Sequence, residues 1–306
     1  MGAGDVAGAV RARALARRRL GPASARRIAG LPGPDAAVAE LATTPYGRYV
    51  RRDDTPAEAE NGIARTVLWH LRVLAGWQSR SAAAPVRLLA AAFELANLDE
   101  HVRRLDGGPA MPPWNLGALA VAWPQLARTG TRAELRAALR RSPWGDPGSD
   151  SPWALTVVPR LAWLHRVSAR VPEAAEWAYG AALLLQAREQ VVARHPLDDP
   201  AAAHVRALTG AATLGAVSLT DLVARADRRA RWAVAGVDDP QDLWRAEARW
   251  WARLDADGLA LLHGMRFGGA VAIGCTAVLA ADAWRVRAAL AAAARDGDTE
   301  VLDAVA

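Results

Sequence analysis

The fold is decided by residues 41–107, which open with Leu-Ala-Thr-Thr-Pro-Tyr-Gly at 41–47. Two long runs follow: PAEAENGIARTVLWHLRVLAGW at 56–77 and PVRLLAAAFELANLDEHVRRL at 85–105. Apolar residues recur in both runs every three or four positions, which is typical of amphipathic helices. These apolar positions are Ile63, Val67, Leu71, Leu74 and Trp77, and then Leu88, Ala92, Leu95, Leu98, Val102 and Leu105.

The connection between the two runs is too short for anything except a tight helical turn. Only residues 78–84 separate them, which predicts an antiparallel hairpin. Pro56 and Pro85 suit the first turn of each helix, and Gly107-Gly108-Pro109 marks the end of the second.

The composition predicts an all-α protein. Apolar residues make up 52% of the 306 residues, with alanine the most frequent, and no alternating run rich in Val, Ile and Thr suggests a sheet. A second helical hairpin is expected from residues 153–170 and 172–194. Residues 243–254 predict one further helix, and residues 269–279 with 284–295 predict a last helical pair.

The Thr-Pro-Tyr-Gly turn has a counterpart 98 residues later. Residues 142–145 read Ser-Pro-Trp-Gly, again after a short helix, in this case one capped by Thr131. A fainter third copy is expected at Thr220–Trp232. This internal similarity indicates an internal helical repeat.

The joint spacing of these residues resembles the first repeat of a component of the V/A-type (vacuolar/archaeal-type) rotary ATPases. That component is the central-stalk connector, designated C in archaea and bacteria and d in eukaryotes. The residues that carry the resemblance are Leu41, Thr44, Pro45, Tyr46, Gly47, Glu60, Leu71, Glu94, Asn97, Leu98 and Arg103. The sequence departs from the family pattern at 280–285, where Lys and Glu are usual before the final Arg. The second repeat also has no Glu-x-x-Asn, and Gln186 and Glu189 are its nearest candidates.

The resemblance implies three similar domains of helical hairpins around a pseudo-threefold axis, forming a funnel. In this sequence they are expected at 1–108, 109–210 and 211–306, in one compact array. It implies a non-catalytic connector in the central stalk of a rotary motor, which couples the shaft of the soluble head to the membrane proteolipid ring during proton or sodium transport. The expected partners are these shaft and ring proteins, and the expected location is cytoplasmic, peripheral to the membrane. Five positions are expected to be structural: Tyr46, Glu94, Asn97, Arg103 and Trp144.

Glu94, Asn97 and His101 fall on one face of the second helix and form a polar stripe. A metal site would need matching ligands on the helix at 56–77, where the candidates are Glu58, Glu60 and His70. We instead expect Glu94 and Asn97 to satisfy buried hydrogen-bond donors. Neither a metal nor a cofactor is expected.

The sequence Asp238-Asp239-Pro240-Gln241-Asp242 matches a magnesium motif of prenyl-transfer enzymes, which leaves an enzyme as one alternative. Pro240 favours a helix start capped by Asp239, and Asp198-Asp199-Pro200 carries the same signal. The sequence contains no lysine, so a Walker nucleotide-binding loop is excluded. We therefore expect no catalysis, and a scaffold or adaptor of another complex is the other alternative.

The net charge of +6 is spread over paired arginines with acidic residues between them, which argues against nucleic-acid binding. Cys275 is the only cysteine, so an internal disulfide is excluded. The most apolar stretch, Phe267–Ala281, is shorter than the roughly 20 residues that a spanning helix needs. The chain is therefore expected to be soluble.

Overall fold

Helices and the turns between them make up residues 3–264 and 268–295, the part of the chain that the computed structural model describes. No strand occurs in that part, which confirms the all-α prediction. The chain divides into two compact units: unit 1 combines Met1–Val86 with Ala248–Ala306, and unit 2 is Arg87–Glu247. These limits do not coincide with the expected limits at 108 and 210, and the division into three repeats stays a prediction.

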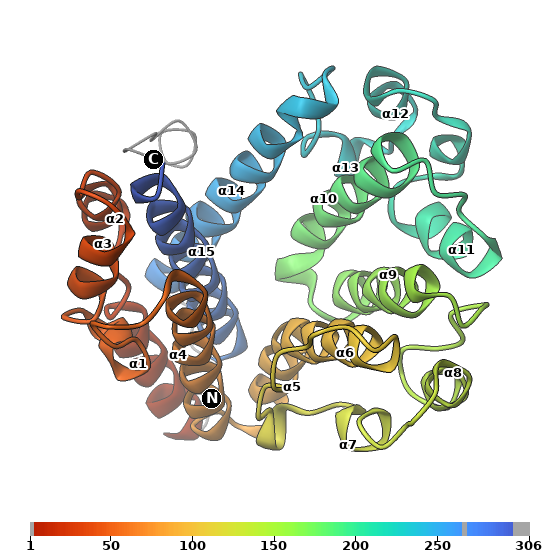
Figure 1. Ribbon diagram of the computed structural model, residues 1–306. Helices are drawn as coiled ribbons and strands as arrows, with labels where there is room; N and C mark the ends of the chain where they lie inside the picture. Colours follow the sequence, from red (N-terminus) through yellow and green to blue (C-terminus); the bar gives the residue numbers. More distant parts are fainter. Residues whose placement is uncertain (1–2, 265–267, 296–306) are drawn as a thin grey trace. The chain divides into compact units, whose positions relative to one another are not determined.

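Unit 1 is built around its last helix, α15 (Gly269–Ala293), which packs against α1, α2, α3 and α4 (Figure 1). The other helices of this unit are α1 (Ala3–Ala16), α2 (Pro22–Ala29), α3 (Pro34–Leu41), η1 (Pro45–Arg48) and α4 (Pro56–Gly76). Two more, α5 (Arg80–Ala90) and α14 (Leu243–His263), begin in one unit and end in the other. The core of unit 1 therefore combines both ends of the sequence.

The expected break within residues 269–295 is wrong, because α15 continues through it as one helix of 25 residues. The polar residue at the expected break, Asp282, is fully buried and hydrogen-bonded, so it does not end the helix. Glycines allow α14 and α15 to pack closely. A Cβ on Gly274 would lie 2.6 Å from the carbonyl oxygen of Gly258, closer than real Cβ atoms come.

Helix α4 follows its sequence pattern at its start and differs at its end. Thr55, directly before Pro56, and Glu58, in the first turn, form a capping box. The stripe of Ile63, Val67, Leu71 and Leu74 is buried as expected. The prediction for Trp77 is wrong: this residue caps the helix C-terminus with 55% of its surface exposed, and the Arg11 guanidinium lies 5.3 Å from its ring centroid.

His70 on α4 is buried, and this burial, together with the charges of Arg18 and Arg48, lowers its pKa to about 4. Between about pH 6.5 and pH 4 the unfolded chain binds a proton here that the folded chain does not bind, so stability falls as the pH is lowered. We expect this group to contribute a loss of about 2 to 3 kcal/mol across that window. Urea unfolding of His70→Leu from pH 4 to 7 should show a flatter pH dependence. An unchanged slope in His70→Leu would contradict the assignment.

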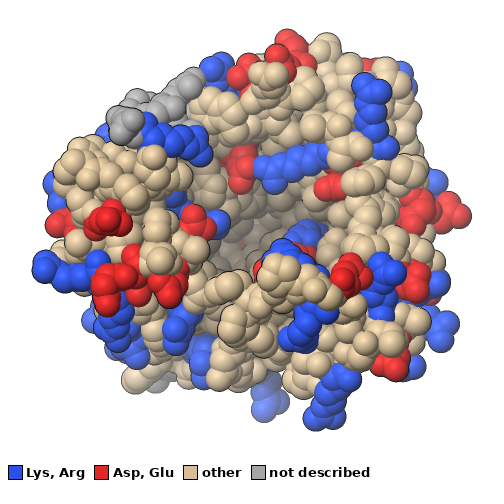
Figure 2. Space-filling view, viewed as in Figure 1, with Lys and Arg blue, Asp and Glu red and all other residues tan. Residues whose placement is uncertain are grey.

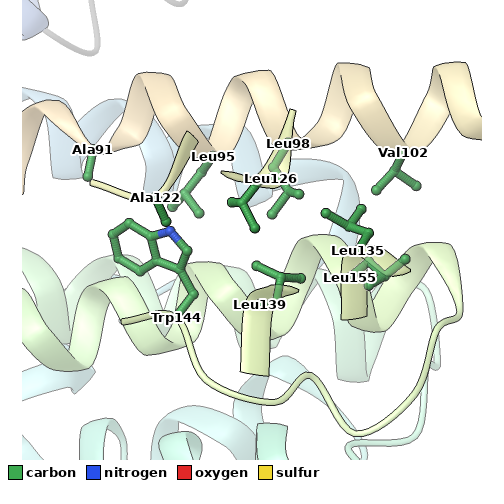
Figure 3. Close-up of a cluster of buried hydrophobic side chains, with 10 residues drawn as sticks. All are labelled: Ala91, Leu95, Leu98, Val102, Ala122, Leu126, Leu135, Leu139, Trp144 and Leu155. Carbon is green, nitrogen blue, oxygen red and sulfur yellow. The ribbon is translucent and has the colours of Figure 1, made fainter. Parts of the chain in front are cut away.

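Unit 2 contains a hydrophobic cluster between α6, α7, α8 and α9 (Figure 3). Leucines from all four helices meet there, and the Trp144 indole lies at one end. The helices of this unit are α6 (Ala92–Leu105), η2 (Gly117–Leu119), α7 (Trp123–Leu126), α8 (Arg132–Arg140), α9 (Pro152–Arg170), η3 (Pro172–Ala174), α10 (Ala175–Gln186), η4 (Ala187–Val192), α11 (Asp199–Leu208), η5 (Ala211–Gly215), α12 (Leu219–Arg225), α13 (Arg228–Arg231) and η6 (Pro240–Asp242).

Helices α9 and α10 pack together, as predicted. The two runs of the first expected hairpin, 56–77 and 85–105, fall largely in different units: α4 packs within unit 1 against α15, and α6 packs within unit 2 against α9. That hairpin stays a prediction. The second run is also two helices rather than one, and Pro85 lies inside α5 instead of starting a helix.

By length and composition, α15 is capable of crossing a membrane, and 78% of its apolar window is buried within the structure. The helix is longer than the apolar stretch of fifteen residues suggests, because α15 extends through Asp282 to Ala293. Phe267, the first residue of that stretch, lies outside the described residues.

Candidate functional site

Glu94 on α6 is a carboxylate in the interior of unit 2, and only 1% of its surface is exposed. One oxygen accepts from the backbone N–H of Val121 at 2.6 Å. The other accepts from the Ala122 N–H at 2.8 Å and from the indole N–H of Trp144 at 2.9 Å. Three donors from two loops therefore converge on one buried carboxylate, which compensates for its burial.

Asp282 on α15 has the corresponding surroundings in unit 1. Its oxygens accept from the backbone N–H groups of Leu20 and Gly21 and from the Tyr46 hydroxyl, each at 2.8 Å. Burial raises the pKa of Asp282, and the hydrogen bonds from Leu20 and Gly21 oppose that rise. Burial, with the nearby charge of Asp282, also raises the pKa of Tyr46, so the phenol remains a hydrogen-bond donor.

The two arrangements share a local geometry. Thr44 and Ser142 each precede the Pro-aromatic-Gly segment, and the side-chain hydroxyl of each accepts from the N–H of the aromatic residue. The aromatic ring then turns inward and donates to a carboxylate that also binds two consecutive backbone N–H groups. The similar sequences at 44–47 and 142–145 therefore produce similar contacts.

Asn97 and His101 continue the polar stripe of α6, and both bind the segment that follows this helix. The Asn97 carboxamide accepts from the Trp114 N–H at 2.6 Å and donates to the Trp114 carbonyl at 3.0 Å. Nε2 of His101 lies 2.8 Å from the Thr129 hydroxyl, which itself donates to the Leu126 carbonyl. Burial and the neighbouring Arg104 lower the pKa of His101, in keeping with a neutral ring.

Replacing Asn97 with leucine should lower the free energy of unfolding by about 1 to 3 kcal/mol, because both polar groups of the Trp114 backbone lose their partner. Urea denaturation followed by tryptophan fluorescence measures this loss. Asn97→Asp is the companion variant: it keeps the acceptor for the Trp114 N–H, but it sets a carboxylate oxygen against the Trp114 carbonyl and adds a charge at a fully buried position, so it should cost at least as much. Equal stability of the leucine variant and the wild type would mean that Asn97 makes no net contribution.

The remaining candidates lie in exposed positions. Arg103 pairs with Glu100 at 2.7 Å on the surface of α6. Glu58 belongs to the capping box of α4, and Glu60 pairs with Arg287 at 3.2 Å. The described residues contain no group of three or more His, Cys, Asp and Glu side chains that is placed to hold a metal ion.

The aspartates near residue 240 lie at the start of a helix. Asp239 accepts from the Gln241 N–H at 2.8 Å as the N-cap of η6, and Asp198 caps α11 in the same manner. Asp238 accepts from the Thr220 hydroxyl at 2.7 Å. The structure therefore uses Asp239 as the cap that Pro240 predicts.

Two polar residues of the buried helices gain importance from the structure. In the sequence, Asp282 belongs only to a departure from the family pattern, yet it has the same contacts as Glu94. The available signal is an isolated acid that follows directly on the long apolar run 269–281. Gln186 on α10, 1% exposed, accepts from the Thr209 hydroxyl at 2.8 Å and donates to the Thr213 carbonyl at 3.2 Å.

Next to Asp282, Arg285 is also buried, and it pairs with Asp255 of α14 at 2.9 Å.

No protein-family model matches this sequence, and comparison with curated proteins gave no match either.

Proposed function

We propose that this protein is a non-catalytic connector in the central stalk of a V/A-type rotary ATPase. It would couple the rotating shaft of the soluble head to the membrane proteolipid ring during ion transport. The proposed partners are the shaft and ring proteins, and the proposed location is the cytoplasmic face of the membrane. The proposed architecture is three pseudo-repeats of helical hairpins arranged as a funnel.

The observation that carries the proposal is the contact between aromatic turn and buried carboxylate, which occurs twice. Tyr46 and Trp144 are positions of the family resemblance, and each donates a hydrogen bond to a carboxylate on a long buried helix, at 2.8 and 2.9 Å. A generic helical protein has no reason to repeat this contact with a different aromatic residue and a different acid. The recurrence supports an ancestral repeat.

Gln186 supports a third repeat, in which an amide replaces the acid. It lies 92 residues after Glu94 and 96 residues before Asp282. Like these acids, it binds a segment that precedes a short helix, in this case the loop before α12. The predicted third turn, Thr220–Trp232, corresponds to α12 and α13, although the cap of α12 is Ser218 rather than Thr220.

A connector that transmits torque needs stiffness, and buried carboxylates provide it locally. Each carboxylate joins a helix to a turn through three charge-assisted hydrogen bonds, which are stronger and more directional than apolar contacts. The close-packed apolar residues around them resist compression. These properties suit a part that carries load between two partners.

Deletion of the gene, followed by fractionation of the cells, tests this function. Without a connector, ATP hydrolysis by the rotary head should move from the membrane fraction to the soluble fraction, and ATP-driven ion uptake by inverted vesicles should stop. Expression of the wild-type chain should restore both. Normal attachment of the head and normal ion uptake in the deletion strain would overturn the proposal.

A further inference from the structure

A groove of about 500 Å³ lies between the end of α7 and the outer face of α8, entirely within unit 2. Its floor is apolar and consists of Val121, Ala122, Ala137, Ala138 and Pro143. Val121 and Ala138 are partly buried and pack against the hydrophobic cluster, to which Ala122 belongs (labelled in Figure 3). The floor of the groove is therefore the surface of that core.

The groove is held in shape from beneath by the polar stripe of α6. Glu94 fixes the backbone of Val121 and Ala122 in the floor, and His101 binds Thr129 in the wall. All of these contacts are made by the chain's own residues. A partner that binds here therefore has little ordering of the groove to oppose its association.

The rim of the groove has two exposed arginines that lack an acidic partner. Arg128 follows the end of α7 and Arg141 the end of α8, and neither pairs with a carboxylate anywhere in the described part of the chain. The one acid of the groove, Glu134, accepts from the Gly130 N–H at 2.7 Å at the start of α8. On the face that Figure 2 shows, arginine and acidic side chains are interspersed.

We propose that this groove binds an acidic segment of a protein partner, with apolar side chains on the floor and two carboxylates on Arg128 and Arg141. A guanidinium matches a carboxylate through two parallel hydrogen bonds, which gives such a contact its orientation. The apolar floor favours a protein segment over a free anion, since an anion has nothing to place there. The inference rests on the proposed function in one respect: that function identifies the complex to which the acidic segment would belong.

Photo-crosslinking of the full chain in native membranes tests the proposal. A benzophenone amino acid replaces Gln125, an exposed residue of the groove, and the crosslinked peptide is identified by mass spectrometry. We expect a protein segment with at least two Asp or Glu residues. The double variant Arg128→Gln/Arg141→Gln should reduce the crosslink about tenfold, and raising the salt concentration should also reduce it.

Arg140→Gln is the matched control, because Arg140 is an exposed arginine of the same helix that does not line the groove. It should leave the crosslink unchanged. A third variant, Ala137→Leu, adds bulk to the floor without altering the charge and should weaken the crosslink as well. Thermal unfolding of every variant shows whether a lost crosslink reflects a lost fold.

The outcomes separate this inference from the proposed function. An acidic segment of a shaft or ring protein supports both. An acidic segment of a protein outside a rotary ATPase supports the groove and counts against the connector. Three outcomes would overturn the proposal that the groove binds an acidic segment: a crosslink to phospholipid, a crosslink that the double variant does not reduce, or no crosslink at all. The deletion experiment would still test the connector function.

Discussion

Glu94→Leu should lower the free energy of unfolding by about 3 to 5 kcal/mol. The leucine removes the acceptor of three donors in the interior of unit 2: the backbone N–H groups of Val121 and Ala122 and the indole N–H of Trp144. Each donor left without a partner in an apolar region costs about 1 to 3 kcal/mol, and partial rearrangement makes the sum smaller than three separate losses. Urea denaturation measures the total.

Glu94→Gln separates the charge from the hydrogen bonds. The amide keeps one acceptor oxygen and introduces two N–H donors beside groups that are themselves donors, so about 1 to 3 kcal/mol should be lost. Native-state hydrogen exchange provides the local readout: the amides of Val121 and Ala122 should exchange faster by about tenfold or more. Unaltered exchange at both amides would mean that Glu94 does not hold this loop.

Asp282→Leu should have a comparable effect in unit 1, a loss of about 3 to 5 kcal/mol. It leaves the N–H groups of Leu20 and Gly21 and the Tyr46 hydroxyl without their acceptor, and it places a larger apolar side chain in a fully buried position. Tyr46→Phe is the milder companion. It removes one of the three donors and leaves the carboxylate with two, so about 1 kcal/mol should be lost.

Hydrogen exchange shows whether the destabilisation by Asp282→Leu is confined to unit 1. The amides of Leu20 and Gly21 should lose protection in Asp282→Leu, whereas those of Val121 and Ala122, in the other unit, should retain it. Equal protection of Leu20 and Gly21 in the variant and the wild type would remove Asp282 from this role. The Glu94 variants should show the opposite distribution.

Local signals in the sequence predict local structure well. Thr131 and Asp239 cap the helices that follow them, as predicted, because a side-chain oxygen that accepts from the second or third N–H of a helix needs only neighbouring residues. The apolar stripe of α4 identifies its buried face for the same reason.

Long-range packing cannot be read from the same signals. The short connection between 56–77 and 85–105 predicts a hairpin, and nothing beside α4 in the sequence indicates that it packs against α15, about two hundred residues later. Pro85 resembles a helix start and lies inside α5, where the context of the fold overrides the preference. Periodicity shows which face of a helix is buried and does not show what covers it.

The sequence identifies some of the residues that form the two carboxylate sites and misses others. Tyr46, Glu94, Asn97 and Trp144 are candidates from the sequence alone, and hydrogen bonds join them to specific partners and pair Glu94 with Trp144. Asp282 is not among the candidates, because an acid in a strongly apolar run suggests a break in the helix. Its partners, Leu20 and Gly21, are more than 260 positions away and leave no pattern beside it.

The composition of unit 1 from both ends of the sequence has a consequence for synthesis on the ribosome. Residues 87–247 are continuous and have emerged before α15 is made, so unit 2 can complete its core while translation proceeds. Helices α1–α4 must wait for α15, and until then their apolar faces lack their main cover. The N-terminal helices are therefore the segment of the nascent chain that most needs a chaperone.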